Sequence, residues 1–329
     1  MQAEKDRLLL DVQALKCFIP TLNGVVRAVD GVDVTLNQGE AFGIAGESGC
    51  GKSMLALAIM GLVPAFEKRI LAGKVLFKGR DLLQCSQKEL SGIRGSRIAM
   101  IFQEPMTSLN PTLRIETQLT EILLRHAEIS AAAAVRRSAE LLEMVNIPAP
   151  QKLLARFPHQ LSGGMRQRVM IAMALACQPE ILIADEPTTA LDVTVQAQIM
   201  TLITDLQKNI GTSTILITHN LGLIAEFAKR VMIMYLGKVV ETADVCELFD
   251  NPMHPYTRGL LHAIPKLGQR SKTGKYRLEE IKGAVPNPLN APAGCRFYPR
   301  CRQAKPICEN KEPHLYKVKD NHYVRCWPD

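Results

Sequence analysis

The sequence predicts an α/β fold with a parallel sheet. Two short apolar runs, at residues 181–184 and 214–218, are typical of buried parallel strands. The stretch between them, residues 193–209, has a helical pattern, so the three together form a βαβ unit. A third apolar run, at residues 41–45, leads directly into a glycine-rich loop. Strands that alternate with helices in this way indicate an α/β domain.

The same patterns predict the remaining elements. The further strands that we expect are 8–17, 28–36, 74–77 and 98–102. The further helices that we expect are 53–62, 118–145 and 167–177. We predict one domain over residues 1–265, and the helices in its middle form a helical subdomain at about residues 104–178.

Positive charge and cysteine are concentrated in the C-terminal part of the chain. The whole chain has 329 residues and a net charge of +8. Residues 266–329 hold 14 Lys/Arg and 6 Asp/Glu, a balance of 14 − 6 = +8, whereas residues 1–265 hold 26 of each. Four of the nine cysteines lie in the last 35 residues. We therefore predict a small, basic, Cys-rich C-terminal domain at 266–329, and its charge alone would suit nucleic acid.

A phosphate-binding motif, G-x-x-x-x-G-K-[ST], follows the strand predicted at 41–45. It consists of Gly46, Glu47, Ser48, Gly49, Cys50, Gly51, Lys52 and Ser53. Glycines let backbone N–H groups converge on phosphate oxygens, and the start of the next helix adds a positive dipole end. Lys52 can reach the β- and γ-phosphates, and the Ser53 hydroxyl can bind Mg²⁺. The motif predicts a P-loop NTPase that binds ATP with Mg²⁺.

Two carboxylates stand at the end of the strand predicted at 181–184. They are Asp185 and Glu186. A buried parallel strand delivers such side chains to the carboxyl edge of the sheet, where ligands bind in open α/β folds. We predict that Asp185 contributes to the Mg²⁺ shell and that Glu186 polarises the water that attacks the γ-phosphate.

Further motifs appear in a fixed order along the chain. They are LSGGMRQR (161–168), ILIADEP (181–187), TALD (189–192) and ITH (217–219). With the phosphate loop, this set resembles the ATP-binding subunits of ABC transporters. The resemblance implies an ABC ATPase domain that hydrolyses ATP and works as a head-to-tail dimer with two sandwiched ATPs. It also implies that Ser162, Gly163 and Gly164, at a helix start, serve the ATP held by the opposite subunit.

The resemblance assigns roles to other residues. Gln103 in IFQEP is similar to the glutamine that senses Mg²⁺ and water and couples to the membrane subunit. Asp192 resembles the dimer-contacting aspartate, a role compatible with an N-cap. His219 resembles the switch histidine on the γ-phosphate. Glu186, His219 and Gln103 thus form the expected catalytic set.

The resemblance does not fix the roles of two further positions. The family often has aspartate directly after the switch histidine, whereas this chain has Asn220. Hydrolysis or dimer coupling is expected to differ accordingly. The aromatic ring that stacks on adenine is expected upstream of the phosphate loop, and Phe18 is our candidate, with a core role as the alternative.

Four other stretches resemble the peptide/nickel branch of importers, and within it the dipeptide/oligopeptide subunits. They are SLNPT (108–112), HPYTRGLL (254–261), GAVPNP (283–288) and GCRFYPRC (294–301). The resemblance implies a subunit on the cytoplasmic face of the bacterial inner membrane. Its partners would be two membrane permease subunits, a second, homologous ATP-binding subunit and an extracytoplasmic peptide-binding protein. The cargo alternatives are nickel, glutathione or another small molecule; a soluble ABC ATPase acting on nucleic acid or ribosomes is the rival from another class.

The four C-terminal cysteines indicate a metal site. Cys295, Cys301, Cys308 and Cys326 follow the pattern C-x5-C-x6-C-x17-C, which lacks the paired C-x-x-C of most zinc ribbons. Four thiolates suit either Zn²⁺ or an iron–sulfur cluster, and free thiols are the third alternative. The resemblance to the dipeptide importer branch favours a [4Fe–4S] cluster. Four arginines flank these cysteines, and we expect them either to offset the negative charge of the cluster or merely to solubilise this part of the chain; they are Arg296, Arg300, Arg302 and Arg325.

Overall fold

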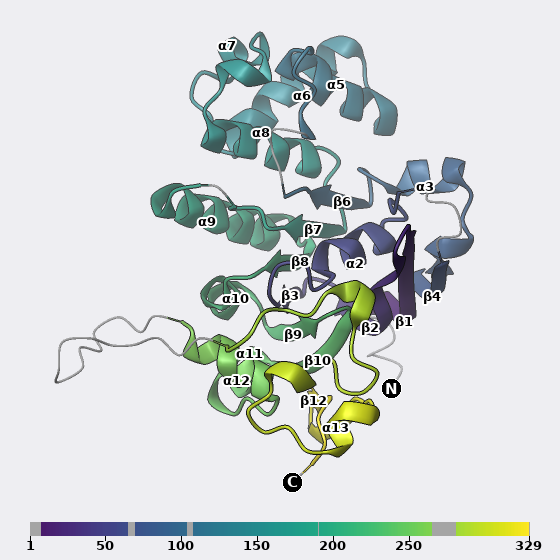
Figure 1. Ribbon diagram of the computed structural model, residues 1–329. Coiled ribbons are helices and arrows are strands. Elements are labelled where there is room, and N and C mark those ends of the chain that lie inside the picture. Colours follow the sequence, from purple (N-terminus) through teal and green to yellow (C-terminus); the bar gives the residue numbers. More distant parts are fainter. Residues whose placement is uncertain (1–7, 65–69, 104–107, 190, 265–280, 329) are drawn as a thin grey trace, which may run out of the picture. The chain divides into compact units, whose positions relative to one another are not determined.

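The computed structural model describes residues 8–64, 70–103, 108–189, 191–264 and 281–328. The chain divides into two compact units (Figure 1). Unit 1 comprises Met1–Leu10, Leu36–Ala41 and Phe77–Ile217, and unit 2 comprises Asp11–Thr35, Phe42–Leu76 and Thr218–Asp329. The predicted domain boundary at 265/266 lies outside the described residues.

Unit 1 contains a parallel arrangement of three strands, in the order β8-β7-β6. The strands are β6 (Ile98–Ile101), β7 (Ile181–Asp185) and β8 (Ser213–Thr218), the last of which ends one residue beyond the unit. Ile183 on the central strand pairs with Met100 on one side and Ile215 on the other. Every residue of β7 and β8 is buried. The continuous apolar runs in the sequence therefore correspond to fully buried parallel strands, as predicted.

Unit 1 has two short helical elements before β6 and a group of four helices after it. The short elements η1 (Leu82–Gln84) and α3 (Gln87–Ile93) come first. Four helices then gather together in the upper part of Figure 1: α5 (Ile115–His126), α6 (Ala131–Met144), α7 (Pro150–Leu154) and α8 (Gly163–Leu175). The 3-10 turn η2 (Pro158–Gln160) precedes α8, and the long α9 (Val193–Ile210) connects β7 to β8.

The prediction of a single long helix over residues 118–145 is wrong. It is two helices, α5 and α6, separated by residues 127–130. Ala127 ends the first helix with an extended backbone, and the hydroxyl of Ser130 caps the second by accepting from the N–H of Ala133. Serine competes with the backbone for hydrogen bonds and favours a cap over a helix interior, which the periodicity alone did not reveal.

Unit 2 contains the other strands. One sheet has the strand order β2-β1-β4, and most residues of these strands belong to unit 2. The strands are β1 (Leu8–Thr21), β2 (Gly24–Asn37) and β4 (Ile70–Phe77). The two-residue β5 (Arg80–Asp81), which follows β4 in this sheet, belongs to unit 1. The second group has the order β11-β12-β10-β9-β3. These strands are β3 (Ala41–Ala45), β9 (Arg230–Tyr235), β10 (Lys238–Asp244), β11 (Tyr316–Lys319) and β12 (His322–Val324).

The C-terminal residues of unit 2 continue the sheet that carries the phosphate loop. β3 runs parallel to β9, β9 is antiparallel to β10, and β10 pairs antiparallel with β12 through Glu241 and Val324. His322 on β12 also contacts the buried Glu241, with 2.8 Å between Nε2 and Oε1. The cysteine-rich end of the chain is thus tied by strand pairing to the same compact unit as the loop.

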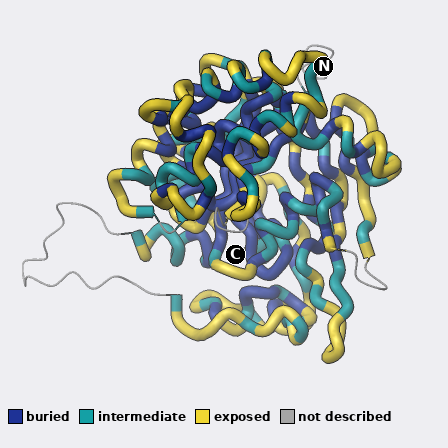
Figure 2. Tube along the Cα trace, turned by 90° about the horizontal axis from the view of Figure 1, so that it is seen from above, coloured by how far each residue is buried: buried dark blue, intermediate teal, exposed yellow. Residues whose placement is uncertain are grey.

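Short helices complete unit 2. They are α2 (Lys52–Ile59), α10 (Leu221–Phe227), α11 (Val245–Asp250), α12 (Pro255–His262), α13 (Ile307–Asn310), η3 (Pro288–Asn290) and η4 (Tyr298–Arg300). Helix α2 begins at Lys52, one residue before the predicted start, and ends at Ile59 rather than Leu62. Figure 2 shows buried, intermediate and exposed segments following one another closely along the chain trace. No described helix is long and apolar enough to cross a membrane.

Candidate functional site

The phosphate loop lies between β3 and α2 in unit 2. Three of its glycines have a left-handed backbone: φ is 152° at Gly46, 77° at Gly49 and 104° at Gly51. A Cβ atom on Gly51 would lie 2.1 Å from the Ala28 carbonyl oxygen, and one on Gly46 would lie 2.3 Å from the Met234 carbonyl oxygen. Only glycine fits these two positions, because both the backbone angle and the packing exclude a side chain.

Lys52 closes the loop on itself. Its side chain is buried, and its Nζ donates to the carbonyl oxygens of Gly46 at 2.8 Å and Glu47 at 3.0 Å. Helix α2 has no side-chain cap at Gly51, so the first N–H groups of the helix have no side-chain acceptor there. A helix start of this kind is suited to a phosphate group, and the ammonium of Lys52 adds a positive charge beside it.

Glu47 is held by the C-terminal part of unit 2. Its N–H donates to the hydroxyl oxygen of Tyr256 at 2.8 Å, and its carboxylate accepts two hydrogen bonds from the Arg300 guanidinium, at 2.6 and 3.0 Å. A bidentate pair of this kind fixes orientation as well as charge. Arg300 is 9% exposed, and its pKa is raised, chiefly by the hydrogen bonds to Glu47. Neither contact was predicted from the sequence, in which Tyr256 stands only within the family stretch HPYTRGLL, because both contacts join residues more than 200 positions apart.

The two carboxylates at the end of β7 differ in their surroundings within unit 1. Asp185 is 3% exposed, as the last residue of a buried strand. Glu186 has a left-handed backbone with φ 45°, which is strained for a residue with a side chain, and its N–H is bonded to the Ile217 carbonyl oxygen at 2.8 Å. Strain of this kind concentrates at functional sites, where it aims a side chain.

Glu186 Oε2 accepts two hydrogen bonds. One comes from the Gln103 side-chain amide at 3.3 Å, and the other comes from the Thr189 hydroxyl at 2.8 Å. The structure thus brings together two of the three residues expected to be catalytic, Gln103 and Glu186. It adds Thr189, the first residue of the TALD motif, for which the sequence predicted no role.

The start of α8 carries the residues expected to act on the opposite subunit's ATP. Ser162 is the N-cap, and its hydroxyl accepts from the Met165 N–H at 3.3 Å. Ser162 and Gly163 are exposed. Asp192 is exposed as well and caps α9, with its Oδ1 accepting from the Val195 N–H at 2.9 Å. The predicted N-cap of α9 is therefore present, while the dimer roles of Ser162, Gly163, Gly164 and Asp192 stay predictions.

His219, Asn220 and Phe18 belong to unit 2. His219 is exposed directly after β8. Asn220, which replaces the expected aspartate, caps α10 by accepting from the Gly222 N–H at 3.0 Å. Phe18 lies on β1 with the Arg27 guanidinium 5.6 Å from its ring centroid. Its role in stacking on adenine stays a prediction, as do the roles of the remaining ATP-site residues.

The four C-terminal cysteines line one small cavity. Its walls also include His254, Phe297, Tyr298 and Trp327. Cys295 and Cys308 are joined by a backbone hydrogen bond of 2.8 Å, and the Lys305 N–H donates to the Cys308 sulfur at 3.4 Å. The fold therefore brings four cysteines that are widely spaced in the sequence to the wall of the same cavity: Cys295, Cys301, Cys308 and Cys326.

Burial affects the titration of three thiols in this cavity. The pKa of Cys295 is raised to about 11, chiefly by burial and to a smaller extent by the neighbouring cysteines. Burial also raises the pKa values of Cys301 and Cys326. Among the described residues, no three or more His, Cys, Asp or Glu side chains form a group that could hold a metal ion. The four cysteines thus line one cavity in this structure without forming a group of that kind.

The expectation that the arginines near the cysteines offset a cluster's charge is incomplete, because three of them form ion pairs elsewhere. Arg296 pairs with Asp30 and also donates to the Leu236 carbonyl oxygen. Arg300 pairs with Glu47, and Arg325 lies 3.4 Å from Glu312. Arg296 and Arg300 fasten the C-terminal segment to residues on and near the phosphate loop, and they are buried for that reason.

Comparison with known proteins agrees with this geometry. Residues 29–189 match the family described as ABC transporter. A bacterial ABC transporter cassette, MJ0796, whose dimeric structure is known, superposes with a TM-score of 0.64 and 28% identity over 72% of this chain and 98% of that one. CbiO1 from Clostridium perfringens, part of an ABC transporter complex, gives a TM-score of 0.62 with 27% identity over 74% of this chain and 92% of that one. The fold and the phosphate loop are those of an ABC ATPase.

Relatives of similar length narrow the class. Residues 240–308 match the oligopeptide/dipeptide transporter C-terminal region. The chain is 51% identical to the oligopeptide transport ATP-binding protein OppD of Bacillus subtilis, over 97% of this chain and 88% of that protein. It is 48% identical to DppD of Bacillus subtilis (97% and 94% covered) and 46% identical to DppD of Escherichia coli (97% and 96%), both dipeptide transport ATP-binding proteins. The chain belongs to the ATP-binding subunits of ABC transporters, in their oligopeptide/dipeptide branch.

Proposed function

We propose that this chain is the ATP-hydrolysing subunit that powers import of di- and oligopeptides through a separate membrane permease. The observation that carries the proposal is the identity of about half of all residues with peptide-transport ATP-binding proteins over nearly the whole chain. This identity includes the C-terminal region, which separates the branch from other ABC ATPases. It favours peptide over nickel or glutathione as cargo, and a transporter over a soluble ATPase acting on nucleic acid or ribosomes.

ATP binds, in this proposal, through the phosphate loop. The N–H groups at the start of α2 hold the β-phosphate, and the Lys52 ammonium exchanges its carbonyl partners for phosphate oxygens. Ser53, Asp185 and Gln103 are the residues that we assign to Mg²⁺, which would neutralise charge on the β- and γ-phosphates. His219 contacts the γ-phosphate, and Phe18 stacks on the adenine.

Hydrolysis proceeds by attack of a water molecule on the γ-phosphorus. The Glu186 carboxylate takes a proton from this water as the bond to phosphorus forms, and ADP leaves with the electron pair of the broken P–O bond. The hydrogen bonds from Gln103 and Thr189 hold Glu186 Oε2, and the strained backbone at Glu186 fixes where the side chain starts. A positioned base of this kind contributes roughly 10² to 10⁴ in rate.

The exposed start of α8 supports a dimer in which each ATP is completed by the other subunit. Ser162, Gly163, Gly164 and Asp192 are the residues that we assign to this contact. We place the subunit on the cytoplasmic face of the inner membrane with two permease subunits, a second, homologous ATP-binding subunit and an extracytoplasmic peptide-binding protein. Residues 1–265 would form the ATPase domain, with its helical subdomain at about 104–178, and residues 266–329 the C-terminal domain.

The peptide assignment is tested with the intact complex reconstituted in liposomes. A mixed di- and oligopeptide pool, loaded on the binding protein, is expected to raise ATP hydrolysis several-fold and to accumulate inside ATP-dependently. Nickel ions and glutathione serve as the matched alternative cargos. Stimulation by either of these, with none by peptides, would overturn the peptide assignment while leaving the ATPase role intact.

For the C-terminal cysteines we propose a [4Fe–4S] cluster rather than a single zinc ion. Four thiolates around one Zn²⁺ each lie about 2.3 Å from the metal, which demands a tight group, whereas a cluster accepts thiolates on its separate corners. The common cavity, the four thiols that line it and the N–H that points at Cys308 support the proposal. Buried among aromatic rings, the cluster would have a structural role. Anaerobic purification followed by iron, sulfide and zinc analysis tests it: zinc without iron would contradict it.

A further inference from the structure

Glu47, the second residue of the phosphate loop, is hydrogen-bonded through its N–H, its carbonyl oxygen and its carboxylate. The carbonyl oxygen accepts from Lys52 Nζ at 3.0 Å, and the N–H donates to the Tyr256 hydroxyl oxygen at 2.8 Å. The carboxylate accepts two hydrogen bonds from the Arg300 guanidinium, at 2.6 and 3.0 Å. Glu47 therefore joins the loop to two residues that lie far beyond it in the sequence.

Tyr256 has a fixed place in a cluster of aromatic rings. Its side chain is fully buried and packs edge-on against Tyr235, with 4.7 Å between the ring centroids. The Phe297 ring, from the same segment as Arg300, lies 5.3 Å from each of the other two, measured between centroids. Aromatic pairs at such distances and angles stabilise one another beyond the burial of their surface. The Tyr256 hydroxyl is therefore held beside the Glu47 N–H.

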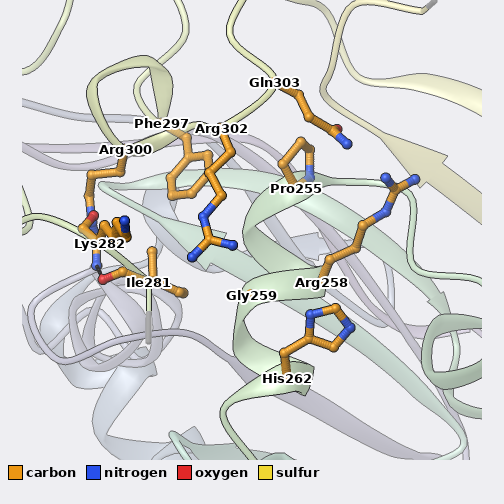
Figure 3. Close-up of a pocket in the computed structure, with 10 residues that line it drawn as sticks. All are labelled: Pro255, Arg258, Gly259, His262, Ile281, Lys282, Phe297, Arg300, Arg302 and Gln303. Atoms are coloured by element: carbon orange, nitrogen blue, oxygen red, sulfur yellow. Dashed lines mark hydrogen bonds between the residues drawn. The ribbon is translucent and has the colours of Figure 1, made fainter. Parts of the chain in front are cut away.

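Arg300 is held by acceptors other than Glu47 as well. It lies beside Ile281 and Lys282 (Figure 3), and its guanidinium donates to their carbonyl oxygens at 3.4 and 3.3 Å. It also donates to the Tyr235 hydroxyl oxygen at 3.4 Å. A buried guanidinium with several fixed acceptors can hold a carboxylate at one position, and two parallel hydrogen bonds set the direction of that carboxylate too.

Lys52 is the partner of Glu47 that ATP binding would remove. Lys52 Nζ donates to the carbonyl oxygens of Gly46 and Glu47, and under the proposed function it exchanges both for phosphate oxygens. Glu47 would then depend on Tyr256 and Arg300 to keep its position. A loop that is already ordered before it binds a ligand loses less conformational freedom on binding, so its affinity is higher.

We propose that Arg300 and Tyr256 are positioning residues for ATP, which keep the phosphate loop in its binding conformation by holding Glu47. The inference rests on the proposed function, because it requires that ATP binds to this loop. The loop contacts the phosphates both in the bound state and in the transition state of hydrolysis, so the two residues contribute to uniform binding. Their loss should therefore raise KM for ATP and leave kcat nearly unchanged.

The test measures KM and kcat for ATP in the intact complex. Arg300→Gln removes two charge-assisted hydrogen bonds to Glu47 and should raise KM about tenfold, with kcat within about threefold of the wild type. Arg300→Lys keeps the charge but cannot form the paired bonds, so its KM should lie between those of the wild type and Arg300→Gln. Tyr256→Phe removes one hydroxyl from a buried ring and should raise KM about threefold.

The matched control is Arg325→Gln. Like Arg300, Arg325 directly precedes a cysteine of the cavity, but its side chain donates to residues outside the loop, which are Val239, Glu312 and Pro313. A merely structural role lowers the amount of active subunit, which reduces kcat and leaves KM unchanged. That result in both Arg300→Gln and Tyr256→Phe, or an equal rise of KM in the control, would overturn the proposal.

A double-variant cycle tests whether the effect of Arg300 passes through Glu47. Glu47→Ala should raise KM about as much as Arg300→Gln, and the double variant should raise it no further, because both changes break the same pair. Effects that multiply in the double variant would show that Arg300 acts by another route and would overturn the assignment. A wild-type complex that does not hydrolyse ATP would refute the proposed function itself, so the two failures are distinguishable.

Discussion

The phosphate loop and the cysteine cavity lie in one compact unit, and they are built in opposite ways. The loop is eight consecutive residues whose useful groups are backbone N–H donors and one lysine. The cavity is made by four side chains spread over the last 35 residues, and its useful groups are sulfur atoms. An added side chain at Gly46 or Gly51 therefore damages the loop, whereas the cavity is damaged by the loss of a thiol.

The two sites also differ in what holds them. Lys52 and the left-handed glycines shape the loop from within, while Tyr256 and Arg300 hold its Glu47 from outside. Arg300 directly precedes Cys301, so the two sites share one stretch of chain. The comparison predicts that each site can be broken without losing the other, and that Arg300 is the point where they meet.

The largest expected effect is that of Lys52→Ala. It removes the positive charge beside the phosphates together with two hydrogen bonds inside the loop, so ATP hydrolysis should fall by about 10² to 10³. Steady-state ATPase assays of the intact complex measure this effect. The metal content of the cysteine cavity should stay that of the wild type, and a joint loss would show that the sites are not independent.

The converse experiment breaks the cavity. Cys295→Ser/Cys308→Ser replaces two thiols by hydroxyls, which are poor ligands for soft metals, so most iron should be lost. ATP affinity should change less than about threefold, since neither thiol contacts the loop. The matched control is Cys85→Ser/Cys246→Ser, which removes two thiols that do not line the cavity. Equal iron loss in both pairs would contradict the assignment of the cluster.

A smaller effect separates two glycines of the loop. Gly51→Ala places a Cβ atom against the Ala28 carbonyl oxygen, while Gly49→Ala has no neighbour within 4 Å. Both positions have a positive φ, so they share the backbone strain. Gly51→Ala should weaken ATP binding about tenfold more than Gly49→Ala, which corresponds to about 1.4 kcal/mol. Equal affinities, measured by titration with a fluorescent ATP analogue, would mean that the close approach is unimportant.

A further expected effect concerns the pH dependence of stability and leaves the chemistry of both sites aside. Burial lowers the pKa of His254 to about 3, from 6.5. His254 stays unprotonated in the folded state, whereas in the unfolded state it takes up a proton below pH 6.5. The contribution of His254 to stability is therefore fully present above pH 6.5 and is lost as the pH falls toward 3. His254→Asn, which keeps an N-cap for α12, should reduce the loss of unfolding free energy between pH 7 and 5 by about 2 kcal/mol. Denaturant unfolding at the two pH values measures it, and an unchanged slope would rule out this histidine as the cause.

The features that could be predicted from the sequence are those formed by consecutive residues. The phosphate loop, the buried strands β7 and β8 and the family branch were all predictable from local patterns, because consecutive residues carry those signals. The break between α5 and α6 was missed, since a single capping serine decided it. The hydrogen bonds that join Glu47 to Tyr256 and Arg300 were also not predicted, because they depend on how segments far apart in the sequence pack together.

The central claim is that Glu186 drives ATP hydrolysis and that hydrolysis drives peptide import. The most direct test is Glu186→Gln in the reconstituted complex, with ATP binding, ATP hydrolysis and peptide uptake measured on the same preparation. The account predicts ATP binding within a few-fold of wild type, hydrolysis reduced by at least about 10² and uptake reduced in parallel. Hydrolysis or uptake at the wild-type rate in this variant would contradict it.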